Sequence, residues 1–355
     1  MSTVRAALVT PLSGPLAGFG RAGAHALGLW AHSAAELPAP AGRVELRVHD
    51  AAPDTAAALR AALATRPQLL FGPYGSGPAL TLAKRTGRLV WNHGGAASEL
   101  GGPTYPQVVS LLAPASSYHA GTLALLRRLD PGLATVVLLH GQTGFGRDVA
   151  AGADAAARRL GFTVRRVAFP SGRAAPAASQ APEGDVLLVA GSFADELVVA
   201  RATLPRRWRA AAFVAAGEEG TLAGLGAARE GLLGPAQWVA SAAPEPDEGP
   251  PAGWFVRAYQ AEVGEPPPYP AAQAFAAGLV AARCARDAGV LDDPALRAAA
   301  RSLSCTTLFG RFRLDDHGRQ VGHRVLTVQW QAGRRRVVWP PELAEAATVH
   351  PRAPV

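Results

Sequence analysis

Two glycine-rich loops, residues 72–78 and 92–98, contain the groups in this chain that are best suited to hold a small molecule. Each loop follows a short apolar run, 69–71 or 88–91, so each is expected at the carboxyl end of a buried strand. Glycine loops expose backbone N–H groups, and a helix that begins after Ser76 adds the positive end of its dipole. We therefore expect a site for a carboxylate or another anionic oxygen, to which Ser76 adds a hydroxyl group.

The second loop combines a glycine backbone with hydrogen-bonding side chains, in the order Asn92, His93, Gly94, Gly95 and Ala96. Two adjacent parallel strands would place this loop beside the first one, where open α/β sheets bind their ligands. A lone histidine between such residues is more often a hydrogen-bonding group than a general base. We interpret the whole segment as part of a binding site.

Aromatic residues recur at the expected ends of strands. The five that do so are Phe19, Tyr74, Trp91, Phe145 and Phe193. Any one of them could be core packing, but five at equivalent positions favour apolar walls around a ligand.

Catalytic signatures are missing from the sequence. Ser76 lacks the outer glycines of a nucleophile elbow, and neither a Walker A pattern nor H-E-x-x-H occurs. Glu218 and Glu219 are adjacent carboxylates without a partner acid at a known distance, so a solvated loop remains an alternative for both. We predict a protein that is not an enzyme and that uses no cofactor and no metal.

One motif favours a different class. Gly18, Gly20 and Gly23 match G-x-G-x-x-G, and Asp50 closes the next strand, which is typical of an NAD-dependent oxidoreductase. The fingerprint, however, requires its first glycine almost at the strand end. Here the loop 11–17, with two prolines, intervenes. NAD binding is kept as the alternative function.

The order of elements predicts an α/β fold with two similar units. Strands alternate with helices at the start of the chain, and the pattern restarts near residue 134, which implies parallel sheets with a cleft between the units. The first unit contains expected strands 4–10, 44–49, 69–71 and 88–91, helices 18–35, 53–64 and 79–85, and an extended segment 105–112. A helix over 114–129 leads into strands 134–139, 162–169, 185–190 and 210–215, helices 147–160 and 194–203, a flexible connection 170–184, and an extended run 232–241. Helices 254–263, 270–287 and 294–302, an extended segment 307–315 and a hairpin of strands 325–330 and 335–339 should complete the two units.

Composition limits the classes of partner. The 355 residues are 49% hydrophobic and 17% charged, which suits a globular chain with two cores. The net charge of +8 comes from scattered arginines without a basic stripe interleaved with aromatics, so no nucleic-acid partner is expected. Cys284 and Cys305 are too few for a disulfide framework, although a single bridge stays open. Residues 4–9 are too short a run for a secretory signal, and no run is long enough to span a membrane.

An ordered set of segments resembles the type I periplasmic solute-binding proteins, in the leucine/isoleucine/valine-binding-like branch that serves ABC transporters. The segments that carry the resemblance are Pro11-Leu12-Ser13-Gly14-Pro15, Phe19-Gly20, Asp50 with Asp54, Gly72-Pro73-Tyr74-Gly75-Ser76-Gly77, Phe145-Gly146-Arg147-Asp148, Phe213-Val214-Ala215-Ala216-Gly217-Glu218 and Thr306-Thr307-Leu308-Phe309-Gly310.

The resemblance implies two Rossmann-like lobes with a ligand cleft between them and three crossover hinges, at 113–116, 241–250 and 315–322. Lobe 1 would comprise residues 1–114 and 246–318, and lobe 2 residues 115–245 and 319–355. The protein would capture a small-molecule ligand, close around it and deliver it to an ABC transporter permease, as an extracytoplasmic monomer. A cytoplasmic ligand sensor of the same fold is the alternative.

The resemblance also implies roles for the site residues. Ser76 and the backbone of residues 94–96 would hold a ligand carboxylate, Phe145 and Phe193 would come from the second lobe, and Glu218 would meet an ammonium group. The threonine usual in the second loop is absent here, and residues 91–93 add bulk and polarity. An aromatic acid, an amide or another small polar metabolite is therefore expected as readily as a branched-chain amino acid.

Overall fold

Strand β1 (Ser2–Thr10) lies between β2 (Ala41–Asp50) and β3 (Leu69–Phe71) in the first sheet. Strands β4 (Val90–Asn92) and β5 (Val108–Ser110) extend the sheet to the order β2-β1-β3-β4-β5, and every pairing is parallel. The three short strands are buried along their whole length, as expected where helices cover both faces of a parallel sheet. The computed structural model describes residues 2–33, 41–206 and 208–352.

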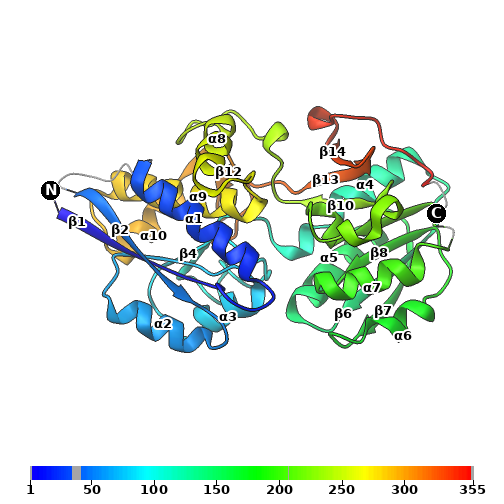
Figure 1. Ribbon diagram of the computed structural model, residues 1–355, viewed down its shortest axis with the longest axis horizontal. Coiled ribbons are helices and arrows are strands. Elements are labelled where there is room, and N and C mark those ends of the chain that lie inside the picture. The colour runs from blue at the N-terminus through cyan, green and yellow to red at the C-terminus, as the bar shows by residue number, and fades with distance from the viewer. Residues whose placement is uncertain (1, 34–40, 207, 353–355) are drawn as a thin grey trace. The chain divides into compact units, whose positions relative to one another are not determined.

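Helices cover both faces of this sheet (Figure 1). Helices α2 (Thr55–Ala64) and α3 (Ser76–Ala83) share one core cluster with Val9, Leu70 and Val90 of the strands. Helices α1 (Ala17–Ser33) and α9 (Tyr269–Ala288) pack against each other on the other face, where the Trp30 ring meets the Phe71 ring edge-on at 5.6 Å. Helix α8 (Ala252–Val263) contacts α1, and α10 (Asp293–Ser302) contacts α9.

A hairpin of β11 (Ser304–Thr307) and β12 (Gly310–Arg313) completes this part. The expectation was a single extended segment over 307–315. The chain instead turns at Leu308 and Phe309, and Gly310, the first residue of β12, has a φ of 143° that is open to glycine and rare for other residues. Gln320 then bridges to Leu314 and donates from Nε2 to the backbone oxygen of Leu111 at 3.0 Å, which ties the following segment to the same part of the chain.

The second sheet has the order β14-β13-β10-β9-β8-β6-β7. Its parallel strands are β6 (Thr135–Gly141), β7 (Thr163–Phe169), β8 (Val186–Ala190), β9 (Ala210–Phe213) and β10 (Leu233–Ala236). The last two strands, β13 (Leu326–Gln331) and β14 (Arg334–Trp339), form the expected hairpin and join β10 in the antiparallel sense.

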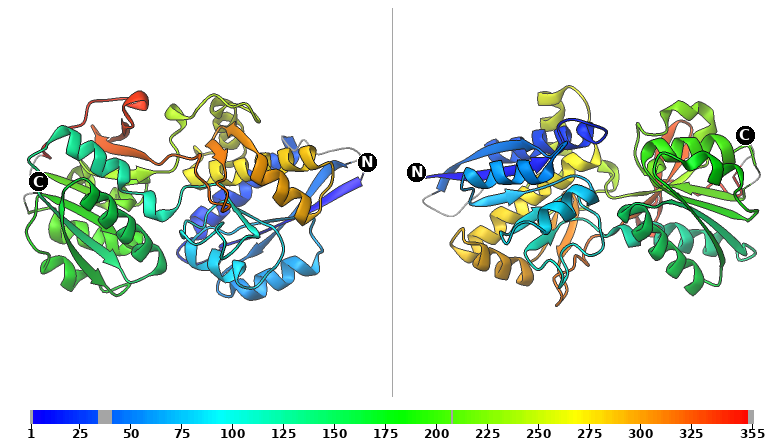
Figure 2. Two further views of the ribbon diagram at one scale, coloured as in Figure 1. Left: turned by 180° about the vertical axis from the view of Figure 1, so that it is seen from behind. Right: turned by 90° about the horizontal axis from the view of Figure 1, so that it is seen from below.

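Helices also cover both faces of the second sheet (Figure 2). Helices α4 (Ala120–Leu129) and α5 (Gly144–Arg159) share one core cluster with Val136 and Leu138, whereas α6 (Ala174–Ser179) and α7 (Phe193–Thr203) share the other with Val137 and Leu139. This alternation along β6 is what a strand buried on both faces requires. The 3₁₀ helices are η1 (Ala115–Ser117), η2 (Val214–Gly217), η3 (Ala223–Arg229), η4 (Ala240–Ala242) and η5 (Pro341–Leu343).

Two expectations needed correction. The segment 170–184 is not a plain flexible connection, because α6 forms inside it and buries Ala174 and Ala178. The helix expected over 114–129 is divided into η1 and α4, which are separated by Tyr118 and His119. The expected end of the first helix, at residue 35, falls outside the described residues.

The chain divides into two compact units. Unit 1 comprises Met1–Ala113 and Ala240–Arg324, and unit 2 comprises Pro114–Val239 and Val325–Val355. The sequence-based division ended its segments at residues 114, 245 and 318. Residues 319–324 group with unit 1, to which the Gln320 bridge with Leu314, the Val321 N–H bond to the Arg313 oxygen and the Gln320 bond to Leu111 hold them.

Candidate ligand-binding site

The two glycine-rich loops of unit 1 lie side by side at the carboxyl end of the sheet. Tyr74 and Gly94 form a parallel bridge, and the Gly75 N–H donates to the Gly94 oxygen at 3.0 Å. The backbones approach so closely that a Cβ at position 94 would lie 2.7 Å from the Cα of Tyr74. Glycine is therefore required here by packing, whatever its role toward a ligand.

Ser76 is the first residue of α3 and lies half-buried at this edge. The residue before it, Gly75, has φ 96° and provides no side-chain cap for the helix. The Ser76 hydroxyl makes no hydrogen bond with any residue that the structure describes. The first turn of α3 thus presents backbone N–H groups, a partial positive charge and an available hydroxyl, which together suit an anionic oxygen.

An aromatic cluster stands next to this helix start. The Phe19 ring stacks on the Tyr74 ring, with centroids 4.9 Å apart and planes 19° apart. The Tyr74 and Tyr269 hydroxyl groups are hydrogen-bonded to each other, and the Tyr269 and Phe19 rings lie 6.2 Å apart. Sequence reasoning missed Tyr269, because an aromatic residue that opens a helix far along the chain carries no signal of this neighbourhood.

Asn92 holds the second loop in place through the hydrogen bonds of its side chain. Its side chain is buried, and its Nδ2 donates to the Ser110 hydroxyl at 2.9 Å and to the Gly95 oxygen at 2.8 Å. Its Oδ1 accepts from the Gly95 N–H at 2.8 Å. The Gly95 N–H is therefore already used, which reduces the backbone donors that this loop offers to a carboxylate. Gly94, Gly95 and Ala96 are themselves buried.

Trp91 and His93 belong to the core of unit 1. Trp91 is fully buried in β4, and the ring of His93 lies against Gly23 of α1, whose Cβ would come within 3.1 Å of its Cε1. Burial lowers the pKa of His93 to about 4, so its ring is neutral. The expectation that these two side chains face a ligand is corrected, because residues 91 and 93 share the face of the sheet that α1 and α9 cover.

In unit 2, Phe145 lies in the first turn of α5, after the carboxyl end of β6. Its ring meets the edge of the Tyr118 ring at 5.7 Å, and Gln237 Nε2 donates to the Tyr118 hydroxyl oxygen at 3.1 Å. Burial raises the pKa of Tyr118 to about 12, which keeps this phenol neutral. Tyr118 and Gln237 were not predicted, since one lies between two helices and the other follows a strand without any motif.

Phe193 and Glu218 follow the carboxyl ends of β8 and β9. Phe193 is the first residue of α7 and packs partly on the core. Glu218 is half-buried, and its Oε2 accepts the N–H groups of Gly220 and Thr221 at 2.9 and 3.1 Å. The sheet thus brings Phe145, Phe193 and Glu218 to one edge of unit 2, but Glu218 already stabilises its own turn.

The glycine pattern near the N-terminus does not form a dinucleotide-binding turn. Gly18, Gly20 and Gly23 all lie inside α1, and a Cβ at position 20 would come within 1.7 Å of the Pro11 oxygen. Asp50 accepts the Leu12 N–H at 2.8 Å and the Ser13 hydroxyl at 2.7 Å, so it holds the loop after β1. Desolvation is the largest single effect on Asp50 and would raise its pKa, but the hydrogen bonds from Ala52, Leu12 and Ser13 together outweigh it and lower the pKa. Gly20 thus allows α1 to pack closely against Pro11, and Asp50 stabilises the loop that follows β1.

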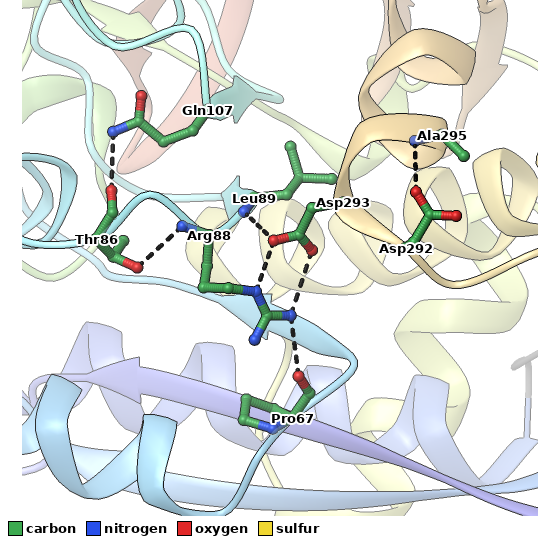
Figure 3. Close-up of polar contacts among 8 residues, drawn as sticks. All are labelled: Pro67, Thr86, Arg88, Leu89, Gln107, Asp292, Asp293 and Ala295. Carbon is green, nitrogen blue, oxygen red and sulfur yellow. Dashed lines mark hydrogen bonds and ion pairs between the residues drawn. The ribbon is translucent and has the colours of Figure 1, made fainter.

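A cavity of about 280 Å³ lies at the opposite end of the unit 1 sheet, beside the start of β4. It is lined by Gly87, Leu89, Gln107, Asp293, Pro294 and Arg297. Figure 3 shows its main polar contact, in which Asp293 accepts from Arg88 Nε at 2.6 Å and from the Leu89 N–H at 2.9 Å. This ion pair ties α10 to the sheet, and we regard the cavity as a by-product of that attachment.

Across residues 2–33, 41–206 and 208–352, no group of three or more His, Cys, Asp or Glu side chains could hold a metal ion. Within the same ranges, no helix combines the length and the apolar character needed to cross a bilayer.

Two α/β units with glycine and aromatic residues at the carboxyl ends of their strands define a two-lobed solute-binding protein. The chain belongs to the periplasmic binding protein family, whose model matches residues 3–335. The sequence-based resemblance to the leucine/isoleucine/valine-binding-like type I proteins and the predicted α/β fold with two Rossmann-like lobes are confirmed.

Solved structures show the same fold at low identity. A leucine-binding protein from Thermotoga maritima has 18% identity and a TM-score of 0.78, over 94% of this chain and 97% of its own. A solute-binding protein of an ABC transporter from R. palustris, in complex with benzoate, has 18% identity and a TM-score of 0.75, over 95% and 96% of the two chains. A solute-binding protein from Rhodopseudomonas palustris BisB5, in complex with 3,4-dihydroxybenzoic acid, has 17% identity and a TM-score of 0.77, over 94% and 95%.

Proposed function

We propose that this protein is the solute-binding component of an ABC transporter and that it captures a small carboxylate-bearing metabolite. The observation that carries the proposal is the start of α3, where the uncapped helix and the available Ser76 hydroxyl lie next to the stacked Phe19 and Tyr74 rings. An anionic oxygen would bind at the helix start, while the apolar body of the solute would lie on the rings.

The surroundings favour an aromatic acid as the first choice of ligand. The aromatic rings of unit 1 offer a stacking surface, and offset stacking of two rings contributes about 0.5–1.5 kcal/mol beyond area burial. Glu218, the expected partner of an ammonium group, has one oxygen engaged by two N–H groups of its own turn, which weakens the case for an amino acid. The benzoate and dihydroxybenzoate complexes of similar proteins support the same choice.

An amino acid is the second candidate. The fold neighbour from Thermotoga maritima is a leucine-binding protein, and the second oxygen of Glu218 has no hydrogen bond among the described residues. Amides remain a third class, because the strand-end loops offer both N–H donors and carbonyl acceptors.

For the mechanism, we propose that ligand bound first to unit 1 gains contacts with Phe145 and Phe193 of unit 2. The closed form is then favoured by the difference in ligand affinity between the two states. A permease would recognise that closed form, and the protein would act as an extracytoplasmic monomer without catalysis. A cytoplasmic ligand sensor would use the same closure but would meet a regulator instead, so detection of the native protein in cell fractions separates the two.

A thermal-shift panel of aromatic carboxylates, amino acids, amides and NAD tests the proposed function, with calorimetry on each compound that shifts the melting temperature. A ligand present at 100 times its dissociation constant stabilises the folded state by about 2.7 kcal/mol, which such a screen detects readily. A shift by benzoate-like acids but not by NAD supports the proposal. A shift by NAD alone, or by no carboxylate, contradicts it.

A further inference from the structure

A buried carboxylate in unit 2 connects two of the strand-end loops. Glu196, in the first turn of α7, is fully buried. Its Oε1 accepts the Gly191 N–H at 2.9 Å, and its Oε2 accepts the Ala215 N–H at 2.7 Å. Gly191 follows β8 and Ala215 follows β9, so one side chain joins the ends of two neighbouring strands.

The preceding residue, Asp195, holds a third loop. Its Oδ1 accepts the Gly172 N–H at 2.9 Å after β7, and its Oδ2 accepts the Ser192 hydroxyl at 2.7 Å. Two consecutive acidic residues therefore fix the loops that follow β7, β8 and β9. Both contact the segment that leads to Phe193, but only Glu196 also bonds to the segment that leads to Glu218.

The segment after β9 is held along its whole backbone. Besides the Ala215 N–H, the Ala215 oxygen accepts from the Thr221 hydroxyl at 2.5 Å, and the Ala216 oxygen accepts from Trp330 Nε1 at 3.0 Å. Arg335 donates to the Gly217 oxygen at 2.5 Å. Glu196 connects this segment by hydrogen bonds to the Gly191 backbone, which precedes the Phe193 loop.

Packing alone does not require an acidic side chain at this position of α7, and burying one costs free energy. Removing a carboxylate from water costs several kcal/mol unless its oxygens are well paired, and a residue such as Met could fill the same volume without that cost. The elements packed against α7 supply no other ionisable side chain at this point, since α6, β8 and η2 contain none and Arg229 of η3 lies over the Trp330 ring. The hydrogen-bond partners of Glu196 are therefore the two loop N–H groups rather than a cation.

We propose that Glu196 is a positioning residue for ligand binding, which holds the Phe193 loop and the Glu218 loop at a fixed separation so that unit 2 meets the ligand with preformed geometry. The proposal rests on the proposed function. Preformed loops lose less conformational entropy on binding, so the expected effect of Glu196 is on affinity.

The test compares Glu196→Gln and Glu196→Met with the wild type, with Thr203→Val as the matched control. Thr203 is also a buried polar residue of α7, but its hydroxyl bonds within the helix, to the Val199 oxygen at 2.7 Å. Glutamine keeps one acceptor oxygen and turns an amide toward the other N–H, whereas methionine keeps neither bond. We expect affinity for the carboxylate found in the panel to fall about tenfold in Glu196→Gln and further in Glu196→Met, with Thr203→Val within about twofold of the wild type.

Residue-resolved hydrogen exchange without ligand provides the second arm. We expect the Gly191 and Ala215 amides to be protected in the wild type and to exchange at least about tenfold faster in Glu196→Gln, while amides in the β6 centre stay unchanged. Unprotected amides in the wild type, or variants that bind as tightly as the wild type, overturn the proposal. A wild-type protein that binds no solute overturns the proposed function instead, and the exchange rates still decide whether Glu196 holds the two loops.

Discussion

The side chain of Asn92 and the backbone of Gly95 exchange two hydrogen bonds, both of 2.8 Å, one donated in each direction. A side-chain amide thereby stands in for a neighbouring strand and fixes the loop that follows β4. Only an amide can do this, because it offers a donor and an acceptor side by side.

We predict that Asn92→Asp destabilises unit 1 by about 2–4 kcal/mol, since a carboxylate cannot donate to the Gly95 oxygen or to Ser110 and would be buried without a cation. Denaturant unfolding measures the loss. Ser110→Ala is the control, and because it removes a single hydrogen bond we expect about 1 kcal/mol. Equal effects of the two substitutions would contradict the role of the Asn92–Gly95 pair.

Ser76→Ala tests the anion site directly. We expect ligand affinity to weaken by about 1–2 kcal/mol, because one hydrogen bond to a charged group is lost, while the melting temperature of the free protein stays the same. The control is Thr81→Val on the same helix, whose hydroxyl bonds to the Gly77 oxygen at 3.0 Å. Calorimetry that finds Ser76→Ala and the wild type equal would remove Ser76 from the site.

Acid should destabilise both units through their buried histidines. Burial lowers the pKa of His93 in unit 1, and likewise of His119 in unit 2, to about 4, whereas the unfolded chain titrates near 6.5. The unfolded state therefore binds a proton first, and stability falls as the pH drops from about 6.5 to 4, by up to about 3 kcal/mol for each histidine.

Denaturant unfolding at pH 7.5, 6 and 5 measures this acid dependence. His93→Leu should flatten it for unit 1 only, and His119→Leu for unit 2 only. If the free energy of unfolding still falls as the pH drops in both variants, groups other than these histidines cause the acid dependence.

Glu196 should give folding stability the opposite dependence on pH. Burial is the largest effect on this group and raises its pKa to about 8, although the two loop N–H groups oppose the shift. The folded state thus keeps a proton that the unfolded state releases near pH 4.5. This contribution to stability is complete below pH 4.5 and is lost as the pH rises toward 8. Glu196→Gln should remove that loss in unfolding curves measured at pH 5, 6.5 and 8, and an unchanged curve would contradict the raised pKa.

Two glycines of α1 provide a matched pair of substitutions. Gly20→Ala would place a Cβ 1.7 Å from the Pro11 oxygen, so we expect a loss of about 2–4 kcal/mol. Gly18→Ala meets nothing within 4 Å and should be neutral or stabilise the helix by up to about 1 kcal/mol. A dinucleotide site would make Gly18→Ala harmful to NAD binding, which a thermal shift with NAD would reveal.

The sequence predicted most strands and their succession along the chain, because buried runs such as 69–71 and 186–190 are bounded by glycine and polar turns. It missed α6, where alanine, proline and serine give no apolar period. The hairpin of β11 and β12 was missed because its turn consists of two apolar residues, Leu308 and Phe309, which carry no turn signal.

The site was predicted less well, for a geometric reason. Strand-end loops can be recognised in a sequence, but the direction of each side chain depends on which face the helices cover. Trp91 and His93 therefore turned out to be core residues, while Tyr74 is part of the aromatic cluster and Ser76 lies beside it. Tyr269 and Gln237 come from distant segments, and only the folded chain brings them near Tyr74 and Tyr118.

The late position of α9 in the chain affects the order in which parts of the protein can fold during synthesis. The face of the first sheet that contains Phe71 and Trp91 is covered by α9, which is made only after every parallel strand of unit 2. Until then the nascent N-terminal segment exposes large apolar side chains to the solvent and cannot complete its core. Unit 2, which needs its last two strands from β13 and β14, waits even longer. Unit 1 therefore cannot finish folding until α9 has been made, and unit 2 cannot finish until β13 and β14 have been made.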